Sequence, residues 1–304
     1  MDVFLRSVGF TRIKFFESIN QIKKELAESP DKQTVLSCGR DSLFVECYKL
    51  FGDGIGILAR GVMSTKDDSI SIESCEAFAI SNGDISVNKY VVEFEKNHPL
   101  IVFEDMVTGN ELVFALQNRI DYIKDEQKFI NHGRSVTYSK NMGIIKRRVN
   151  YTAFSVYGVV ILPVYKQDDE NPSYWEEGED ENDYQSKILR LGESDDDSLN
   201  LIQTYAEVIV QDIEERLLEE DVLSVVEGFF LPMEESEADY SLLGEIEEVT
   251  HIENEYTKEK IVRLSLNVTG TKVQLLINKR DLIGHPSVGM RFMGTCRLRG
   301  RVVI

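Results

Sequence analysis

Apolar residues near the N-terminus recur with the period of a helix, and the pattern then changes to short runs. Four apolar residues spaced by three or four positions predict an amphipathic helix that ends before Pro30; they are Phe16, Ile19, Ile22 and Leu26. Runs of β-branched and aromatic residues follow, several separated by turn sequences that contain glycine. They predict strands in antiparallel hairpins over residues 42–51, 55–63, 76–80, 90–95, 100–107 and 111–116.

A second helix and a long strand complete this N-terminal block. Residues 116–129 have apolar residues at helical spacing, and the uncharged run that ends at Tyr165 predicts a buried strand over 151–165. We therefore expect residues 1–165 to form an α+β domain with helices on one face of an antiparallel sheet. The residues expected to face inward from the second helix are Leu116, Ile120, Ile123 and Phe129.

The apolar pattern disappears in the middle of the chain. Residues 167–183 contain nine acidic residues and no basic one, and such a stretch buries too little apolar surface to offset the entropy of ordering it. We therefore expect residues 166–194 to be an acidic flexible linker. Trp175, the only tryptophan, stands in this stretch, and it is interpreted either as a local contact with a neighbouring domain or as an anchor for a partner.

A helical pattern returns over residues 195–240, which we expect to be a helical connector with a short buried strand. An acidic cluster followed by Ser198 suits the positive end of a helix. The apolar run 222–231, stopped by Pro232, predicts the strand. The helix carries a continuous apolar stripe, most simply a packing face, which consists of Leu199, Ile202, Tyr205, Ala206, Ile209, Ile213 and Leu217.

The C-terminal residues 241–304 predict a separate domain of short strands. Alternation of apolar and polar residues is clear in several runs, which indicates strands with one buried face. Five such strands with one short helical insert are typical of a small five-stranded β-barrel of the OB-like or SH3-like type. The expected strands cover residues 244–252, 260–268, 272–278, 291–298 and 300–304.

Charge is distributed unevenly over these segments. The whole chain has 34 basic and 53 acidic residues and a net charge of −19, which argues against indiscriminate binding to nucleic acid or to an anionic membrane. The net charge is −1 for residues 1–165, −21 for 166–240 and +3 for 241–304. The acidity therefore belongs to the middle of the chain and does not exclude a local basic face at the C-terminus.

Basic residues concentrate in the C-terminal strands, where residues 260–304 hold nine basic residues and one acidic residue. Over 291–304 the alternation places Phe292, Cys296, Leu298, Val302 and Ile304 on one side and the arginines on the other. A basic face on a small barrel is the electrostatic signature expected for binding phosphate or acidic surfaces. The candidate binding face consists of Arg263, Lys272, Lys279, Arg280, Arg291, Arg297, Arg299 and Arg301.

Candidates for catalysis or metal binding are few. The four cysteines, Cys38, Cys47, Cys75 and Cys296, form no CxxC pair and are interpreted as reduced core thiols of a cytoplasmic protein. His251 and Glu253 would share one face of a strand, but no further ligand accompanies them. We therefore expect no metal and no cofactor. The first residues lack the apolar core of a signal peptide, so we expect no export.

Six stretches in order along nearly the whole chain support a resemblance to a known family. They are FLRSVGF at 4–10, ALQNRIDYIK at 115–124, VYGVVILPV at 156–164, ERLLEEDVLSVVEGFFLP at 215–232, DYSLLGEI at 239–246 and NKRDLIGHPSVGMRFMGTCRLRGRV at 278–302. Together they resemble an uncharacterised bacterial family, largely from anaerobic Firmicutes, catalogued as domain of unknown function 3881. The resemblance implies a cytoplasmic bacterial protein and assigns no activity or catalytic residue.

Three hypotheses for function follow. The first is a non-enzymatic interaction or regulatory protein whose basic C-terminal face docks acidic surfaces, either of a partner protein or of the chain's own acidic segment. The second is binding of RNA or single-stranded nucleic acid by the same face, although residues 241–304 offer only Tyr256 and Phe292 for base stacking. The third is an enzyme whose site combines distant residues such as His98 and His132.

Overall fold

The structure is a computed structural model of the full chain, and it describes residues 2–81, 85–95, 98–106, 108–131, 147–163, 226–234 and 236–304. Trp175, the acidic linker and the apolar stripe at 199–217 lie outside the described residues, so the corresponding statements stay predictions. Residues 1–162 and 228–304 belong to one unit of the chain, and all elements below belong to it.

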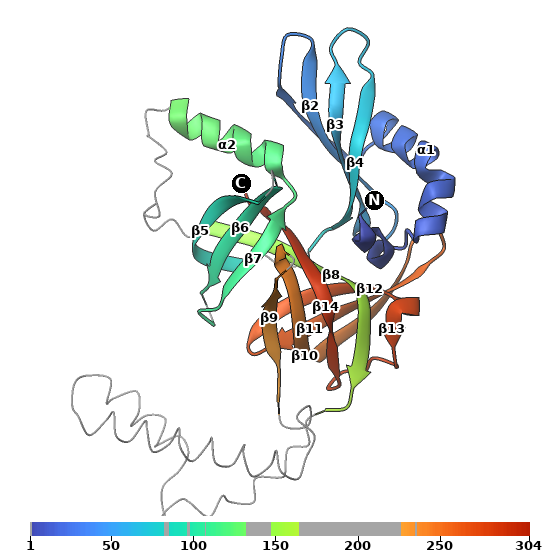
Figure 1. The fold of residues 1–304 in the computed structure, drawn as a ribbon, viewed down its shortest axis with the longest axis vertical. Coiled ribbons are helices and arrows are strands. Elements are labelled where there is room, and N and C mark those ends of the chain that lie inside the picture. The colour runs from blue at the N-terminus through green and yellow to red at the C-terminus, as the bar shows by residue number, and fades with distance from the viewer. Residues whose placement is uncertain are drawn as a thin grey trace, which may run out of the picture. The chain divides into compact units, whose positions relative to one another are not determined.

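The first sheet, sheet A, is antiparallel with the strand order β1–β2–β3–β4, and Figure 1 shows α1 beside it. The expected antiparallel hairpins are therefore confirmed for this part of the chain. The first strand was not expected from the sequence. The elements of this region are η1 (Val3–Val8), α1 (Arg12–Glu28), β1 (Lys32–Ser37), β2 (Ser42–Leu50), β3 (Ile55–Ser64) and β4 (Ile70–Ala79).

Helices α1 and α2 (Arg119–Asn131) pack on opposite faces of sheet A. The Cys47 thiol of β2 donates a hydrogen bond to the Leu26 carbonyl of α1 at 3.5 Å. On β1, the Thr34 hydroxyl donates to the Asp121 carboxylate of α2 at 3.2 Å. Thr34 pairs with Glu46, the residue before Cys47. Because successive residues of a strand face opposite sides, Thr34 and Cys47 lie on opposite faces of sheet A. The expected arrangement with helices on one face is therefore wrong.

Helix α2 also begins later than expected, because Leu116 is the last residue of a strand and not part of the helix. Ile120 is buried as predicted, whereas Ile123 is 39% exposed. Of the described positions expected to face inward from α2, burial is therefore confirmed at Ile120 and not at Ile123. The Phe129 side chain lies outside the described residues.

The second sheet, sheet B, is mixed and contains ten strands. Most neighbours are antiparallel, but β12 and β13 both run parallel to β8, and β14 runs parallel to β7. Its elements are β5 (Ile85–Glu95), β6 (His98–Asp105), β7 (Glu111–Leu116), β8 (Arg147–Ile161), β9 (Phe229–Met233), β10 (Ser236–Glu253), β11 (Lys260–Val268), β12 (Thr271–Asn278), η2 (Lys279–Asp281), β13 (Leu282–Ile283) and β14 (Arg291–Val302).

Strands β8 and β14 pair with each other and belong to two circuits of paired strands. One circuit runs β8–β12–β11–β10–β14, and the other runs β8–β5–β6–β7–β14. Residues 241–304 therefore do not form the separate five-stranded barrel expected from the sequence, because β8 from the N-terminal half lies between β12 and β14. Figure 1 shows β5–β7 and β9–β12 on either side of these two strands.

Strand β14 joins what the sequence analysis separated into two strands, 291–298 and 300–304. Gly300 does not break it, because this glycine permits close approach to β8: an added Cβ would overlap the Asn150 carbonyl oxygen. The inward positions of Phe292, Cys296 and Leu298 are confirmed, as is that of Val302. Ile304, beyond the strand, is 57% exposed.

The described residues form two apolar cores. The first lies within sheet B and includes Phe114, Tyr151 and Phe292. The second lies between sheet A, α1 and η1, and it also contains four residues from the other side of sheet B: Phe154, Ile252, Ile261 and Leu276. Part of sheet B is therefore buried on both faces. None of the described helices is long and apolar enough to cross a membrane.

Candidate functional site

The eight basic residues expected on one exposed face fall into two groups in the structure. Arg291, Arg297, Arg299 and Arg301 lie on β14, where three of the four guanidinium groups stack on aromatic rings of η1 and β4. The other four lie on the β11–β12 hairpin and η2. The structure therefore does not bring the eight residues together on one surface.

Arg299 is enclosed, with 4% of its side chain exposed. Its guanidinium donates to both carboxylate oxygens of Asp2, at 2.6 and 2.9 Å, and to the Ala77 carbonyl at 3.3 Å. The rings of Phe4 and Phe154 lie 5.4 and 5.6 Å from its guanidinium carbon. This geometry satisfies Arg299 within the fold and leaves it no access to an external ligand.

Asp2 owes its position to backbone hydrogen bonds as well as to Arg299. Its carboxylate accepts from the Phe4 amide at 3.2 Å as the N-cap of η1, and from the Ala77 amide of β4 at 3.0 Å. Burial raises the pKa of Asp2, but the charge and hydrogen bonds of Arg299 outweigh burial and lower that pKa overall. Asp2 is therefore ionised at neutral pH and links η1, β4 and β14.

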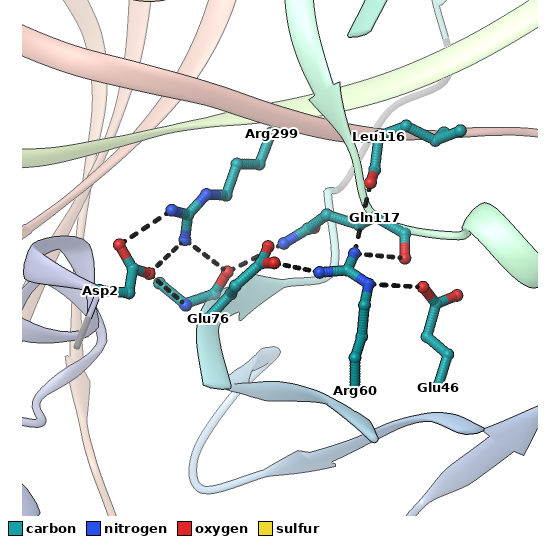
Figure 2. Close-up of polar contacts among 8 residues, drawn as sticks. Asp2, Glu46, Arg60, Glu76, Leu116, Gln117 and Arg299 are labelled. Atoms are coloured by element: carbon teal, nitrogen blue, oxygen red, sulfur yellow. Dashed lines mark hydrogen bonds and ion pairs between the residues drawn. The ribbon is translucent and has the colours of Figure 1, made fainter. Parts of the chain in front are cut away.

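A second arginine, Arg60 of β3, extends this polar group, as Figure 2 shows. Its Nε donates to Glu46 at 3.0 Å, and another of its nitrogens forms an ion pair with Glu76. Its remaining nitrogen donates to the carbonyls of Leu116 and Gln117, at 3.4 and 3.3 Å. We name this group the charged junction; it comprises Asp2, Glu46, Arg60, Glu76 and Arg299.

The carboxylates of the charged junction have shifted pKa values in opposite directions. Burial raises the pKa of Glu76, but Arg60, Arg299 and Arg119 outweigh it and lower the pKa overall. For Glu46, burial exceeds the effect of Arg60, and its pKa is raised. Each carboxylate has a guanidinium partner, so the arrangement ties β2, β3 and β4 to β14 by charge. These contacts explain a structural role and require no substrate.

The other arginines of β14 also have partners within the fold. Arg297 donates twice to the carboxylate of Asp239 on β10, both at 2.6 Å. The Arg301 guanidinium carbon lies 5.3 Å from the centre of the Phe78 ring. Arg291 is 3% exposed, and its Nε donates to the Leu162 carbonyl at 2.9 Å.

The second group is more exposed, although three of its members form ion pairs. Arg263 contacts the Asp53 carboxylate at 3.3 Å and keeps only 10% of its side chain exposed. Lys272 is 74% exposed and lies 3.3 Å from Glu247. Arg280 is 68% exposed and pairs with Glu259, and Lys279 is exposed. Of the eight candidates, Lys272, Lys279 and Arg280 are the most accessible.

Lys279 and Arg280 belong to a local cluster that we name the basic end, formed by Arg6, Lys258, Lys260, Lys279 and Arg280. Ile261 pairs with Asn278; Lys260 precedes the first of these residues in β11, and Lys279 follows the second as the first residue of η2. Arg280 contacts the buried Glu259 at 3.4 Å with 68% of its side chain exposed, and Arg6 pairs with the buried Asp281. Lys258 lies 3.7 Å from Glu253. Among the described residues, Lys260 and Lys279 form no ion pair.

The cysteines do not offer an activated nucleophile. Burial raises the pKa of Cys47 and that of Cys75 to about 11, and it also raises the pKa of Cys296. These thiols are therefore protonated at neutral pH and react slowly. Cys38 is exposed.

Histidine and metal chemistry find little support in the described part of the chain. His251 and His285 are both exposed. The side chains of His98 and His132 lie outside the described residues. Within the described ranges, no three His, Cys, Asp or Glu side chains are grouped so that they could hold a metal ion.

Sequence reasoning missed four of the five residues of the charged junction, all but Arg299. Glu46 and Arg60 each stand among mostly apolar residues in a strand, in the sequences SLFVECYKL and IGILARGVM. A single charge inside an apolar strand run is a signal for a buried ion pair, because such a charge needs a partner when it leaves water. Asp2 carries no such signal, since its role depends on a strand almost 300 positions later.

Comparison with known proteins gives one relationship. No match is found among curated proteins or among solved structures. The family described as "Domain of unknown function, E. rectale Gene description (DUF3881)" matches residues 5–300, which is nearly the whole chain. The chain therefore belongs to the DUF3881 family.

Proposed function

We propose that the protein is a non-enzymatic interaction or regulatory protein of the cytoplasm whose basic end docks an acidic surface of a partner protein. The observation that carries the proposal is that Lys260 and Lys279 are two exposed cations at the same end of the β11–β12 hairpin, without ion pairs among the described residues. The cytoplasmic part of the proposal rests on four cysteines that are all free thiols.

Two features support the basic end as a docking surface. Its counter-charges Glu259 and Asp281 are buried, with 2% and 5% of their side chains exposed, whereas Arg280 and Arg6 are 68% and 48% exposed. The cations are therefore presented to solvent above carboxylates that are set back from the surface. Such an arrangement attracts an acidic partner at short range even when the whole chain is negatively charged.

The proposed surface is smaller than the face expected from the sequence. Arg299 and Arg291 are buried, and Arg297 is held by Asp239. What remains of that face is the group around Lys279 and Arg280, joined by residues that the sequence analysis did not include, such as Arg6. The proposal therefore keeps the expected acidic partner and moves the contact to one end of the β11–β12 hairpin.

The experiment measures binding of fluorescently labelled polyglutamate to the full chain at low and moderate ionic strength. The double variant Lys260→Glu/Lys279→Glu should weaken binding about ten-fold, which corresponds to about 1.4 kcal/mol. The matched control is Lys66→Glu/Lys272→Glu, which makes the same change of charge at two lysines that are each 74% exposed and paired with a carboxylate. This control should bind almost as the unchanged protein does.

Two outcomes would contradict the proposal. Equal weakening by both double variants would show that only net charge matters. Absence of binding at low ionic strength would remove the basic end as a docking surface. A single-stranded RNA probe in the same assay separates the alternative: tighter binding of RNA than of polyglutamate, lost in Lys260→Glu/Lys279→Glu, would assign the surface to nucleic acid.

A further inference from the structure

A row of apolar residues crosses five neighbouring strands of sheet B on the side away from its core. Gly158 and Phe292 face the core side, since an added Cβ on Gly158 would overlap the Phe292 ring. Val159 and Met293 follow them in β8 and β14 and therefore face the opposite side. Direct pairings across the strands then define the row, which consists of Ile283, Val159, Met293, Leu243 and Phe229.

Residues next to this row extend it into a surface. Tyr157 and Ile161 lie on the same side of β8 as Val159, and Leu231 lies on the same side of β9 as Phe229. Ile283, Tyr157 and Leu231 are 56%, 52% and 55% exposed. We name this surface the outer apolar face; it comprises Tyr157, Val159, Ile161, Phe229, Leu231, Leu243, Ile283 and Met293.

The described elements that cover this side of sheet B lie over the beginning of β8 and not over its end. Phe154 is fully buried in the core shared with η1 and sheet A, and Val156 packs against that core. From Tyr157 onward no described element of that core covers the strand. At the centre of the outer apolar face Leu243 is fully buried, while the residues around it are half-buried or exposed. An apolar surface of this kind, exposed at Tyr157, Leu231 and Ile283, marks a site of interaction.

The size of the outer apolar face indicates its occupant. Five strands spaced by about 4.8 Å span about 19 Å, and the stretch from Tyr157 to Ile161 covers about 13 Å. The resulting patch of roughly 250 Å² is less than half of the roughly 800 Å² per partner that a stable dimer buries. It matches one face of a single α-helix, which is about 10 Å wide and spans 19 Å with about 13 residues.

Charges at the border of the face indicate what flanks the apolar stripe of such a helix. Glu245 is exposed and lies next to Arg291 on this side of the sheet. At the other border, Arg297 and Asp239 already neutralise each other. The exposed charge at the accessible border is therefore the Glu245 carboxylate, which complements Lys or Arg residues on the helix.

We propose that the outer apolar face binds an amphipathic helix of a partner protein, with basic residues beside the apolar stripe of that helix. The mode is a helix laid on an apolar surface, with side chains spaced by three and four residues as contacts. This surface is separate from the basic end and differs from it in sign of charge and in chemistry. A negative result for one of the two proposals therefore does not contradict the other.

The test uses the full chain and a labelled synthetic helical peptide of about 14 residues that has one leucine stripe flanked by lysines. A peptide of the same composition, with an order that gives no stripe, is the control. The striped peptide should bind about ten-fold more tightly than the control peptide. Tyr157→Ser/Ile283→Ser should abolish most of this difference, because it removes the two most exposed aromatic and aliphatic contacts.

Matched variants distinguish binding at the outer apolar face from nonspecific hydrophobic binding and from an effect of net charge. Phe44→Ser alters a similarly exposed aromatic residue of sheet A, 51% against 52% for Tyr157, and should leave binding unchanged. Glu245→Lys should weaken binding about three-fold, whereas Glu73→Lys, at an exposed position of β4, should not. Thermal unfolding of each variant checks that the fold is retained.

Three results would overturn the proposal. Equal affinity for striped and scrambled peptides would remove the helix as the occupant. An equal effect of Phe44→Ser would remove the face as the site. A photo-crosslinking residue in place of Tyr157 tests which molecule occupies the face. A crosslink between two copies or within one chain, formed without peptide, would assign the face to the protein itself and not to a partner.

Discussion

The charged junction and the basic end use the same kinds of side chain in two different surroundings. At the charged junction, Arg299 lies in the middle of a strand that is covered by η1 and β4, and 4% of its side chain is exposed. At the basic end, Lys279 follows the last residue of a strand and is exposed. The position along a strand and the presence of a second layer therefore decide whether a cation is structural or available.

This difference has an energetic cause. A guanidinium that leaves water loses hydration and must regain it from carboxylates and carbonyls, which is why Arg299 and Arg60 each have several acceptors. An exposed lysine keeps its hydration and gains little from a neighbour. Removing a cation should accordingly cost stability at the charged junction and cost only binding at the basic end.

The largest expected effect is that of Arg299→Ala. The substitution leaves the buried carboxylate of Asp2 without its partner, and breaking such a pair costs about 3–5 kcal/mol. Urea unfolding of the full chain measures the loss. Lys279→Ala serves as the control from the basic end and should change the free energy of unfolding by less than about 0.5 kcal/mol. Similar losses for the two variants would abolish the distinction between the regions.

A smaller loss of stability is expected for Arg297→Ala. Arg297 is intermediate in exposure between the charged junction and the basic end, with 31% of its side chain exposed. The variant loses two hydrogen bonds to Asp239 and the contact with the Phe4 ring, and we expect a loss of about 1–2 kcal/mol. Arg297→Lys should recover only part of it, because lysine cannot donate from two fixed nitrogens. Full recovery by lysine would mean that charge alone matters at this position.

The smallest expected effect depends on pH and concerns Asp2. Its pKa is lowered in the folded protein, so its contribution is present above its ordinary value of 3.8 and is lost as the pH falls through the folded pKa. For one group the slope cannot exceed about 1.4 kcal/mol per pH unit. The stability difference between the unchanged protein and Asp2→Asn should therefore shrink below pH 3.8.

The measurement is urea unfolding of both proteins at a series of pH values. A difference that stays constant down to pH 2.5 would contradict the assigned role of Asp2. Glu46 acts in the opposite sense, because its raised pKa favours protonation in the folded state and adds stability as the pH falls. Since Glu46 is the same in both proteins, the comparison removes most of its contribution.

The sequence predicted individual strands well because a strand's inner and outer positions alternate locally. Phe292, Cys296 and Leu298 are buried as expected from that alternation. Pairing partners could not be predicted in the same way, since nothing in the local pattern of β8 indicates that it pairs with β12 and β14. The expected separate barrel was wrong for this reason. Strand β1 was missed because KQTVLS is short and partly polar.

The candidate site could be predicted only in part for a related reason. Alternation correctly separated the arginines of β14 from its apolar residues, but it does not show whether a second layer covers their side of the strand. That layer consists of η1 and β4, and its contacts with Arg299 come from Asp2 and Ala77. None of the described elements forms such a layer over the basic end, and the exposure expected for Lys279 and Arg280 is found.

The position of β8 between strands from the far end of the chain also sets the order in which the protein can fold during synthesis. Strand β8 ends at Ile161, whereas its partners β12, β13 and β14 begin at Thr271 and later. Until the ribosome has released the chain through Val302, one edge of β7 and most of β8 have backbone groups without their partners. Sheets with such distant pairings close slowly, and unpaired edges associate with other chains. The nascent chain therefore carries these unpaired strand edges until its last strand has been synthesised.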